Sequence, residues 1–158
     1  MGTFSAVEFA SALSDFVFAH NENSREKWTL HKSDHGMYAK QSIMIRWKDE
    51  SINRQVHITH NSIYGVPVLW FNFFRRGGEP LSGDEIIEIG NSTTDVQPSS
   101  SSRSSLAASL TLNEHPHLGV LFYHIHPCHT LDIMKELPAA SNYIARFLFI
   151  SLKVHEEG

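Results

Sequence analysis

Three apolar segments between residues 37 and 74, separated by short polar turns, constrain the fold of this chain more than any other feature. In residues 37–47 and 56–60, apolar and polar side chains alternate, as in strands with one face against a core. Residues 66–74 are almost continuously apolar, so this strand is expected to be covered on both faces. The connections are too short for helical crossovers, which predicts an antiparallel meander. Lys48 to Asn53 is expected to form a polar turn, and Tyr64-Gly65 is expected to break or bulge the strand that precedes it.

Helical patterns flank these strands. Residues 4–20 bring Phe9, Leu13 and Phe16 to one face, which predicts an amphipathic helix. Residues 138–152 carry a second such pattern, and a proline suits the first turn of that helix. Two capping boxes predict helix starts, the second ahead of a short helix: Ser5-Ala6-Val7-Glu8 and Ser82-Gly83-Asp84-Glu85. Thr3 is an alternative start for the first helix.

The remaining segments complete a single domain, residues 1–158. Residues 28–31 and 118–123 predict two further strands. Residues 91–105 are polar, with six serines among the seven residues 99–105, and we expect a flexible loop there. An apolar content of 41% over 158 residues provides for one full core. The predicted fold class is α+β, with N-terminal and C-terminal helices packed on an antiparallel meander sheet.

Composition excludes several classes of protein. A formal charge of -4 and a pI near 6.2 argue against nucleic acid as a partner. No apolar run approaches the roughly 20 residues that span a bilayer, and the N-terminus lacks the pattern of a signal peptide. One cysteine cannot form an internal disulfide, so a reducing compartment, the cytoplasm, is the expected location.

The single cysteine, Cys128, is the strongest chemical feature of the chain. Three of the eleven histidines lie within four positions of it, and Pro127 stiffens the approach. A histidinium beside a thiol favours the nucleophilic thiolate. We therefore interpret Cys128 as a reactive thiol at the end of a strand. The alternative is a buried, inert cysteine, because free cysteine is among the most buried residue types. The neighbouring histidines are His124, His126 and His129.

Zinc binding is a rival use of the same residues. Zinc sites prefer paired ligands with C-x₂₋₄-C or H-x₃₋₅-H spacing, and no such paired set is present. We therefore expect no metal. A cysteine hydrolase would need a base and an orienting residue; no motif of that class is present, but composition does not exclude it. The six possible zinc ligands are His115, His117, His124, His126, Cys128 and His129.

Two blocks of the sequence carry recognisable motifs. The first reads Glu114-His115-Pro116, Leu118-Gly119 and His126-Pro127-Cys128-x-Thr130. The second reads Tyr64-x-x-Pro67-Val68-Leu69-x-Phe71, Gly78-x-Pro80-Leu81 and Asp84-x-Ile86. The two blocks cover about half of the chain and follow one another along it as they do in the autophagy-related protein 10 family of ubiquitin-conjugating-enzyme-like transferases, which they resemble. The related autophagy-related protein 3 shares the first block's cysteine motif, but it carries a long acidic insertion for which this chain has no room.

The resemblance implies a ubiquitin-conjugating-enzyme-like fold and a definite reaction. An E1-like activating enzyme, autophagy-related protein 7, would deliver the ubiquitin-like autophagy-related protein 12 to Cys128 as a thioester. A lysine of autophagy-related protein 5 would then attack the thioester and form an isopeptide bond. The activating enzyme consumes the ATP, so the resemblance implies no cofactor on this chain. The lack of a long apolar run leads us to expect no stable membrane insertion.

The resemblance also implies two assisting residues, Tyr64 on the strand before Pro67, and His126. Ordinary ubiquitin-conjugating enzymes use the asparagine of a His-Pro-Asn motif to support the oxyanion, and this chain has no such motif. Tyr64 could donate its hydroxyl to the oxyanion, and His126 could do likewise or orient the lysine. The alternatives are an aromatic side chain that packs under the sheet for Tyr64, and a turn histidine bonded to backbone for His126.

A non-catalytic adaptor with the same fold is a second hypothesis for this chain. Such a protein would bind partners through a sheet edge, because unpaired strand edges accept strands from other chains. Residues 56–60 are the segment that we expect at such an edge. The intact Cys128 argues against the adaptor, which has no need of a nucleophile.

Overall fold

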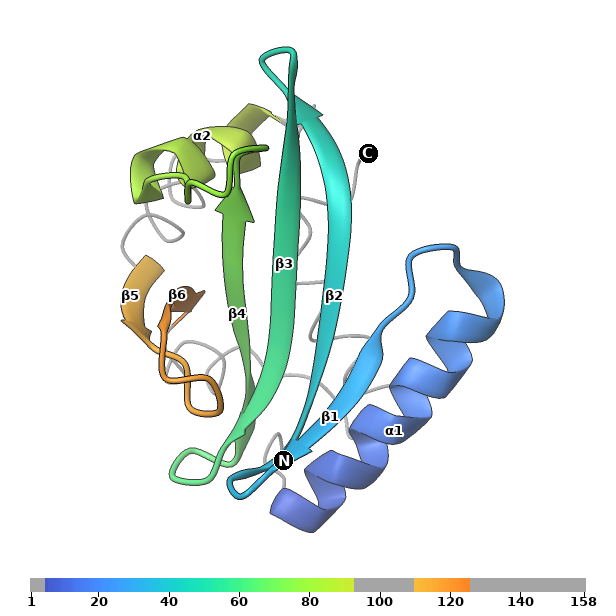
Figure 1. Ribbon diagram of the computed structural model, residues 1–158. Helices are drawn as coiled ribbons and strands as arrows, with labels where there is room; N and C mark the ends of the chain where they lie inside the picture. Colours follow the sequence, from blue (N-terminus) through green and yellow to red (C-terminus); the bar gives the residue numbers. More distant parts are fainter. Residues whose placement is uncertain (1–4, 93–109, 126–158) are drawn as a thin grey trace.

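One open antiparallel sheet with two helices on one face forms the framework of the protein. The computed structural model describes residues 5–92 and 110–125. Six strands lie in the order β1-β2-β3-β4-β6-β5, and Figure 1 shows α2 beyond the end of β4. The elements are α1 (Ala6–Asn23), β1 (Thr29–Ser33), β2 (Gly36–Trp47), β3 (Glu50–Asn61), β4 (Val66–Phe74), α2 (Gly83–Ser92), β5 (Leu110–Glu114) and β6 (Leu121–Ile125).

The predicted meander is confirmed for β1 to β4, which pair antiparallel in chain order. The prediction that residues 66–74 are covered on both faces is also confirmed, since Val66 to Phe73 are all buried. The predicted turn at residues 48–53 is wrong, because β2 and β3 extend until only two residues remain between them. Lys48 and Asp49 make this turn with φ values of 48° and 63°, which is the left-handed geometry of a two-residue hairpin turn.

The expectation that residues 56–60 form a sheet edge is wrong. They lie in β3, which pairs with β2 on one side and with β4 on the other along nearly its whole length. In the sheet formed by the described residues, the edge strands are β1 and β5. A proline at Val56 would break ladder hydrogen bonds in the middle of the sheet, so its effect could not be read as loss of partner binding.

The last strand begins later than the apolar run at residues 118–123 predicts. Residues between β5 and β6 form a turn in which the His115 N–H donates to the Val120 carbonyl at 2.8 Å. Gly119 has a φ of 71°, which side chains rarely adopt. β6 therefore starts at Leu121. The predicted C-terminal helix and most of the predicted loop at 91–105 lie outside the described residues; residues 91 and 92 belong to α2.

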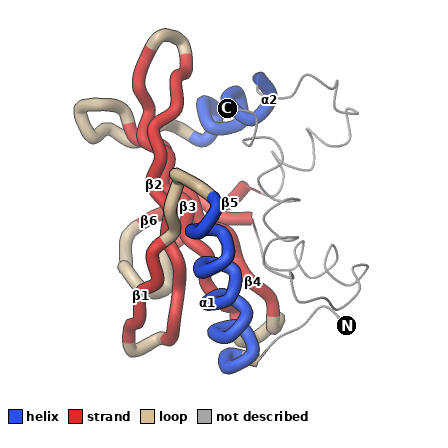
Figure 2. The backbone as a smooth tube through the Cα atoms, turned by 90° about the vertical axis from the view of Figure 1, so that its right-hand side faces the viewer, coloured by secondary structure: helices blue, strands red, loops and turns tan. Residues whose placement is uncertain are grey.

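The N-terminal helix α1 covers one face of the sheet (Figure 2). It starts at the predicted capping box, in which Ser5 and Glu8 exchange backbone and side-chain hydrogen bonds of 2.9 and 3.2 Å. Its apolar stripe meets the sheet, and α2 adds to the same core. The buried core residues on this face are Phe9, Leu13, Val17, Trp28, Ala39, Ile52, Val56, Ile58, Leu69, Phe71, Phe73, Leu81, Ile86 and Ile89.

Replacing Ser5 with alanine is expected to lower the free energy of unfolding by about 1 kcal/mol, because the first turn of α1 loses its side-chain acceptor. Urea denaturation followed by tryptophan fluorescence measures the change. Ser11→Ala is the matched control, since Ser11 lies on the exposed face of the same helix. An equal loss in both variants would mean that the cap does not stabilise α1.

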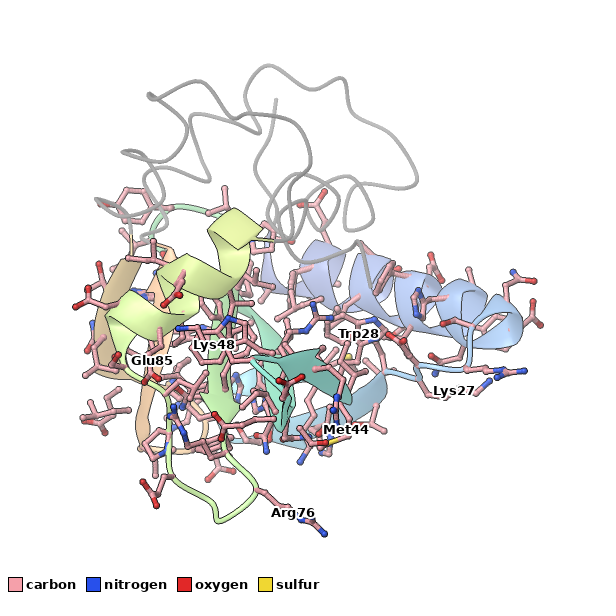
Figure 3. The ribbon with its side chains drawn as sticks, turned by 90° about the horizontal axis from the view of Figure 1, so that it is seen from above. Lys27, Trp28, Met44, Lys48, Arg76 and Glu85 are labelled. Atoms are coloured by element: carbon pink, nitrogen blue, oxygen red, sulfur yellow. The ribbon has the colours of Figure 1, made fainter. Side chains whose placement is uncertain are left out.

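The second predicted capping box, at the start of α2, is also confirmed. The Glu85 N–H donates to Ser82 Oγ at 3.2 Å, and Glu85 Oε1 accepts from the Ser82 N–H at 3.0 Å. Arg75 forms an ion pair with the same carboxylate at 2.6 Å, and its hydrogen bond lowers the pKa of Glu85 to about 2. Lys48, in the β2–β3 turn, pairs with Glu88 at 2.9 Å. These ion pairs join α2 to the neighbouring chain segments; Figure 3 labels one member of each pair, Lys48 and Glu85.

Candidate active site

Tyr64 lies in the turn between β3 and β4, two residues before β4 begins. The expectation of a strand position for Tyr64 is therefore wrong. The sequence predicts that Tyr64-Gly65 breaks or bulges the strand, and the structure has the break. Asn61 shapes this turn: its side-chain oxygen accepts the Tyr64 N–H at 2.9 Å, and its carbonyl accepts the Gly65 N–H at 2.8 Å. Tyr64 is half-buried, so part of the residue meets solvent.

The other two predicted site residues, Cys128 and His126, lie outside the described residues, as do His129 and Thr130. The structure does describe the strand that leads to them. β6 ends at Ile125, three positions before Cys128 in the sequence, and it lies between β4 and β5. The prediction that a strand precedes the cysteine is confirmed.

His124 has a structural environment on β6. Its ring is buried and stacks on Trp70 of β4, with centroids 4.4 Å apart and planes 10° from parallel. Its Nδ1 lies 3.3 Å from the Thr111 carbonyl of β5. Tyr123, the preceding residue, faces the opposite side of the sheet and packs against the α1-side core.

Sequence reasoning missed a cluster of buried rings on the sheet face opposite α1, which we call the back-face cluster. His57 and His115 are each 1% exposed, with ring centroids 4.9 Å apart. Phe122 lies 4.9 Å from His57 and 5.1 Å from His115. The sequence gives one signal for this cluster, namely a histidine that alternates with core residues along a strand. His57 is that histidine. The members are Tyr38, His57, Trp70, His115 and Phe122.

Burial controls the charge of both histidines in this cluster. Burial lowers the pKa of His57 from its usual value to about 3, and charges at His115, Lys40, His31 and His117 contribute further. Burial, with a smaller contribution from His117, lowers the pKa of His115 to about 4. Both rings are therefore neutral near pH 7.

The zinc hypothesis finds no support in the described part of the chain, where no three His, Cys, Asp or Glu side chains are grouped to hold a metal ion. His115 is engaged at both ring nitrogens, by His57 and by two backbone N–H groups. The three remaining candidates from His126 onward lie outside the described residues. Among the helices that are described, none is long and apolar enough to cross a membrane.

Comparisons with known proteins agree on one family. The model of the autophagocytosis-associated protein active-site domain matches residues 18–154. The chain is 38% identical over 89 residues to the ubiquitin-like-conjugating enzyme ATG10 of Arabidopsis thaliana, covering 54% of this chain and 36% of that protein. It is 29% identical over 110 residues to autophagy-related protein 3 of Dictyostelium discoideum, covering 63% of this chain and 29% of that protein. The chain thus spans about a third of the length of these curated relatives.

A solved structure supports the fold. The crystal structure of the autophagic E2 Atg10 superposes over the full length of both chains with a TM-score of 0.57 at 14% sequence identity. This match confirms the predicted ubiquitin-conjugating-enzyme-like fold class, an antiparallel sheet with helices packed on it.

Proposed function

This chain belongs to the autophagocytosis-associated protein family, as its resemblance to the autophagy-related protein 10 family predicted, and we propose that it is an E2-like enzyme that carries a ubiquitin-like protein on Cys128. One observation carries the proposal. The family's active-site domain matches residues 18–154, and this segment contains the only cysteine of the chain. A thioester requires a thiol, so Cys128 is the only side chain that can form one.

The reaction consists of two acyl transfers. The Cys128 thiolate attacks the C-terminal carbonyl of the modifier, which the activating enzyme holds as a thioester, and the thiol of that enzyme leaves. A lysine amine of the acceptor then attacks the new thioester, loses a proton and expels the Cys128 thiolate, which leaves an isopeptide bond. We propose autophagy-related protein 7 as the activating enzyme, autophagy-related protein 12 as the modifier and autophagy-related protein 5 as the acceptor. The expected location is the cytoplasm.

Tyr64 and His126 are the proposed assisting residues. The attack of lysine develops negative charge on the carbonyl oxygen, and a fixed hydroxyl lowers the barrier by donating to it. The half-buried Tyr64, held by Asn61 in a tight turn, suits this role. His126, two residues before Cys128, would orient the lysine or share the oxyanion.

Replacing Tyr64 with phenylalanine is therefore expected to slow transfer to the acceptor about 100-fold, in the range for loss of one oxyanion donor, while thioester formation stays largely intact. Single-turnover discharge of the purified thioester measures the effect. Tyr38→Phe, which removes a hydroxyl from the back-face cluster, is the control. Transfer at the wild-type rate in Tyr64→Phe would assign Tyr64 a packing role only.

A charging assay tests the proposed function. The protein is mixed with the activating enzyme, the modifier and ATP, and gels are run with and without thiol reductant. The expected product is an adduct that appears only with ATP and that the reductant removes. If a charging system that is active on a known conjugating enzyme leaves this protein unmodified, the transferase proposal fails and the adaptor hypothesis takes its place.

A further inference from the structure

The turn between β5 and β6 folds over the back of the sheet, on the side away from α1 (Figure 2). His115 organises this turn from within. Its Nδ1 accepts the N–H groups of His117 at 3.1 Å and Leu118 at 3.3 Å. Its own carbonyl accepts the Gly119 N–H at 2.9 Å. The other ring nitrogen, Nε2, lies 3.0 Å from Nδ1 of His57 on the central strand β3.

These contacts fix the proton positions on both rings. A neutral imidazole has one N–H and one acceptor nitrogen. His115 Nδ1 accepts two backbone N–H groups, so the His115 proton is on Nε2 and is donated to Nδ1 of His57. The His57 proton is then on Nε2, which is buried and has no hydrogen-bond partner among the described residues. The hydrogen bonds therefore all run in one direction: backbone N–H groups of the turn donate to His115, and His115 donates to His57 on β3. We call this chain of hydrogen bonds the relay.

We propose that His57 and His115 are positioning residues for the chemistry at Cys128, because their neutral relay fixes the β5–β6 turn, and with it β6, against the sheet. This inference rests on the proposed function. β6 is the strand from which the chain runs on to Cys128, three residues after Ile125. Within the described residues, β6 is joined to β4 by two register pairs, Trp70 with His124 and Phe71 with Tyr123, and by the Asn72 side chain, which donates to the Leu121 carbonyl at 3.1 Å. The turn adds a further attachment of β6 to the sheet, through His115 and His57.

The same turn is also held at its far side. The Nδ1 atom of His117 is hydrogen-bonded to Ser33 Oγ at the end of β1, and the His117 ring packs on Tyr38 of β2, with centroids 4.4 Å apart. The turn therefore spans the sheet from β6 to β1. His57, at the middle of this span, accepts the hydrogen bond by which His115 of the turn reaches the central strand β3.

Protonation of either ring would break the relay. A second proton on His57 would set its Nδ1–H against the Nε2–H of His115, and a second proton on His115 would face two backbone N–H groups. The charged and titratable groups around the pair disfavour a second proton as well, because they are basic: His31 from β1, Lys40 from β2 and His117 from the turn. β4 and β6 contribute Trp70, Phe122 and His124.

Two variants of equal shape separate positioning from packing. In His57→Asn the side-chain oxygen occupies the position of Nδ1 and can accept from His115, whereas His57→Leu has the same branching and no acceptor. We expect discharge of the Cys128 thioester to fall about 10-fold or more in His57→Leu, the scale of a displaced reacting group, and to stay near wild type in His57→Asn. If burial of an apolar side chain were all that mattered, His57→Leu would discharge the thioester faster than His57→Asn, which is the opposite of the expected order.

Two readouts keep this test independent of the proposed function. Long-range ¹H–¹⁵N spectra of the histidine rings are expected to show both rings neutral, with the proton on Nε2 in each. The alkylation rate of Cys128 by iodoacetamide, which reads a single thiol in this chain, is expected to change several-fold in His57→Leu and to be restored in His57→Asn. Both measurements test the positioning role without any thioester. A wild-type protein that forms no thioester would therefore refute the proposed function and leave the positioning role to be decided by these two readouts.

Three results would overturn the positioning role. One is an Nδ1–H proton on either ring at pH 7. Another is a His57→Leu protein that is folded by circular dichroism and matches wild type in both alkylation and discharge. The third is a His57→Asn protein that is folded and as impaired as His57→Leu.

Discussion

Replacing Cys128 with serine is expected to abolish the reductant-sensitive adduct completely. A serine hydroxyl is a far weaker nucleophile than a thiolate near pH 7, and any ester that it forms is an oxygen ester, which thiol reductants do not cleave. The variant should therefore show either no adduct or a reductant-resistant one, and it should transfer no modifier to the acceptor. The measurement is the charging gel run with and without reductant.

Cys128→Ala is the companion variant, because it removes both the thiol and the hydroxyl and should carry no adduct of either kind. The interpretation is unusually direct, since the chain has no second cysteine. A reductant-sensitive adduct that persists in Cys128→Ser would have to come from another component, and the proposed carrier role of Cys128 would be wrong.

Acidification from pH 7 to pH 5 is expected to lower the free energy of unfolding by about 4 kcal/mol, about 2 for each of His57 and His115. Both have a lower pKa in the folded chain, about 3 and about 4, than the usual 6.5. Each therefore takes up a proton on unfolding in this range. The stability that depends on the neutral rings is present above about pH 6.5 and is lost as the pH falls toward the folded values. This loss is a large share of the 5–15 kcal/mol typical of a domain.

Urea denaturation at pH 7, 6 and 5, at constant ionic strength, measures this dependence through tryptophan fluorescence. His57→Asn provides the internal control, since it removes one of the two titrating rings and should reduce the pH dependence by about half. A stability that does not change between pH 7 and pH 5 would mean that the back-face histidines are not held neutral by the fold.

Local patterns predicted the elements well, because each depends on neighbours in the sequence. Both capping boxes need only four consecutive residues, and both are present as expected. Strand order and strand ends depend on pairing, which the sequence does not display. The predicted meander already places residues 56–60 between its other two strands, so the expectation of a sheet edge there conflicted with it, and the structure follows the meander. The start of β6 is set by the turn at His115, not by the apolar run.

The candidate site was predictable only where a motif carried it. Cys128 and His126 come from the sequence, and the comparisons support the family to which their motif belongs. The pairing of His57 with His115 could not be predicted, because the two residues are 58 positions apart and meet only through the sheet topology. In the sequence, His115 was a possible zinc ligand; in the structure, both of its ring nitrogens are already engaged.

The strand order has a consequence for how the chain folds. β1 to β4 form from neighbouring hairpins, so their contacts are local and the loops that close them are short. β5 pairs only with β6 in the described sheet, and β6 reaches β4 from about 50 residues away along the chain. The β5–β6 hairpin should therefore dock late, as one unit, onto a preformed four-stranded sheet, and the two histidines would lock it in place after docking.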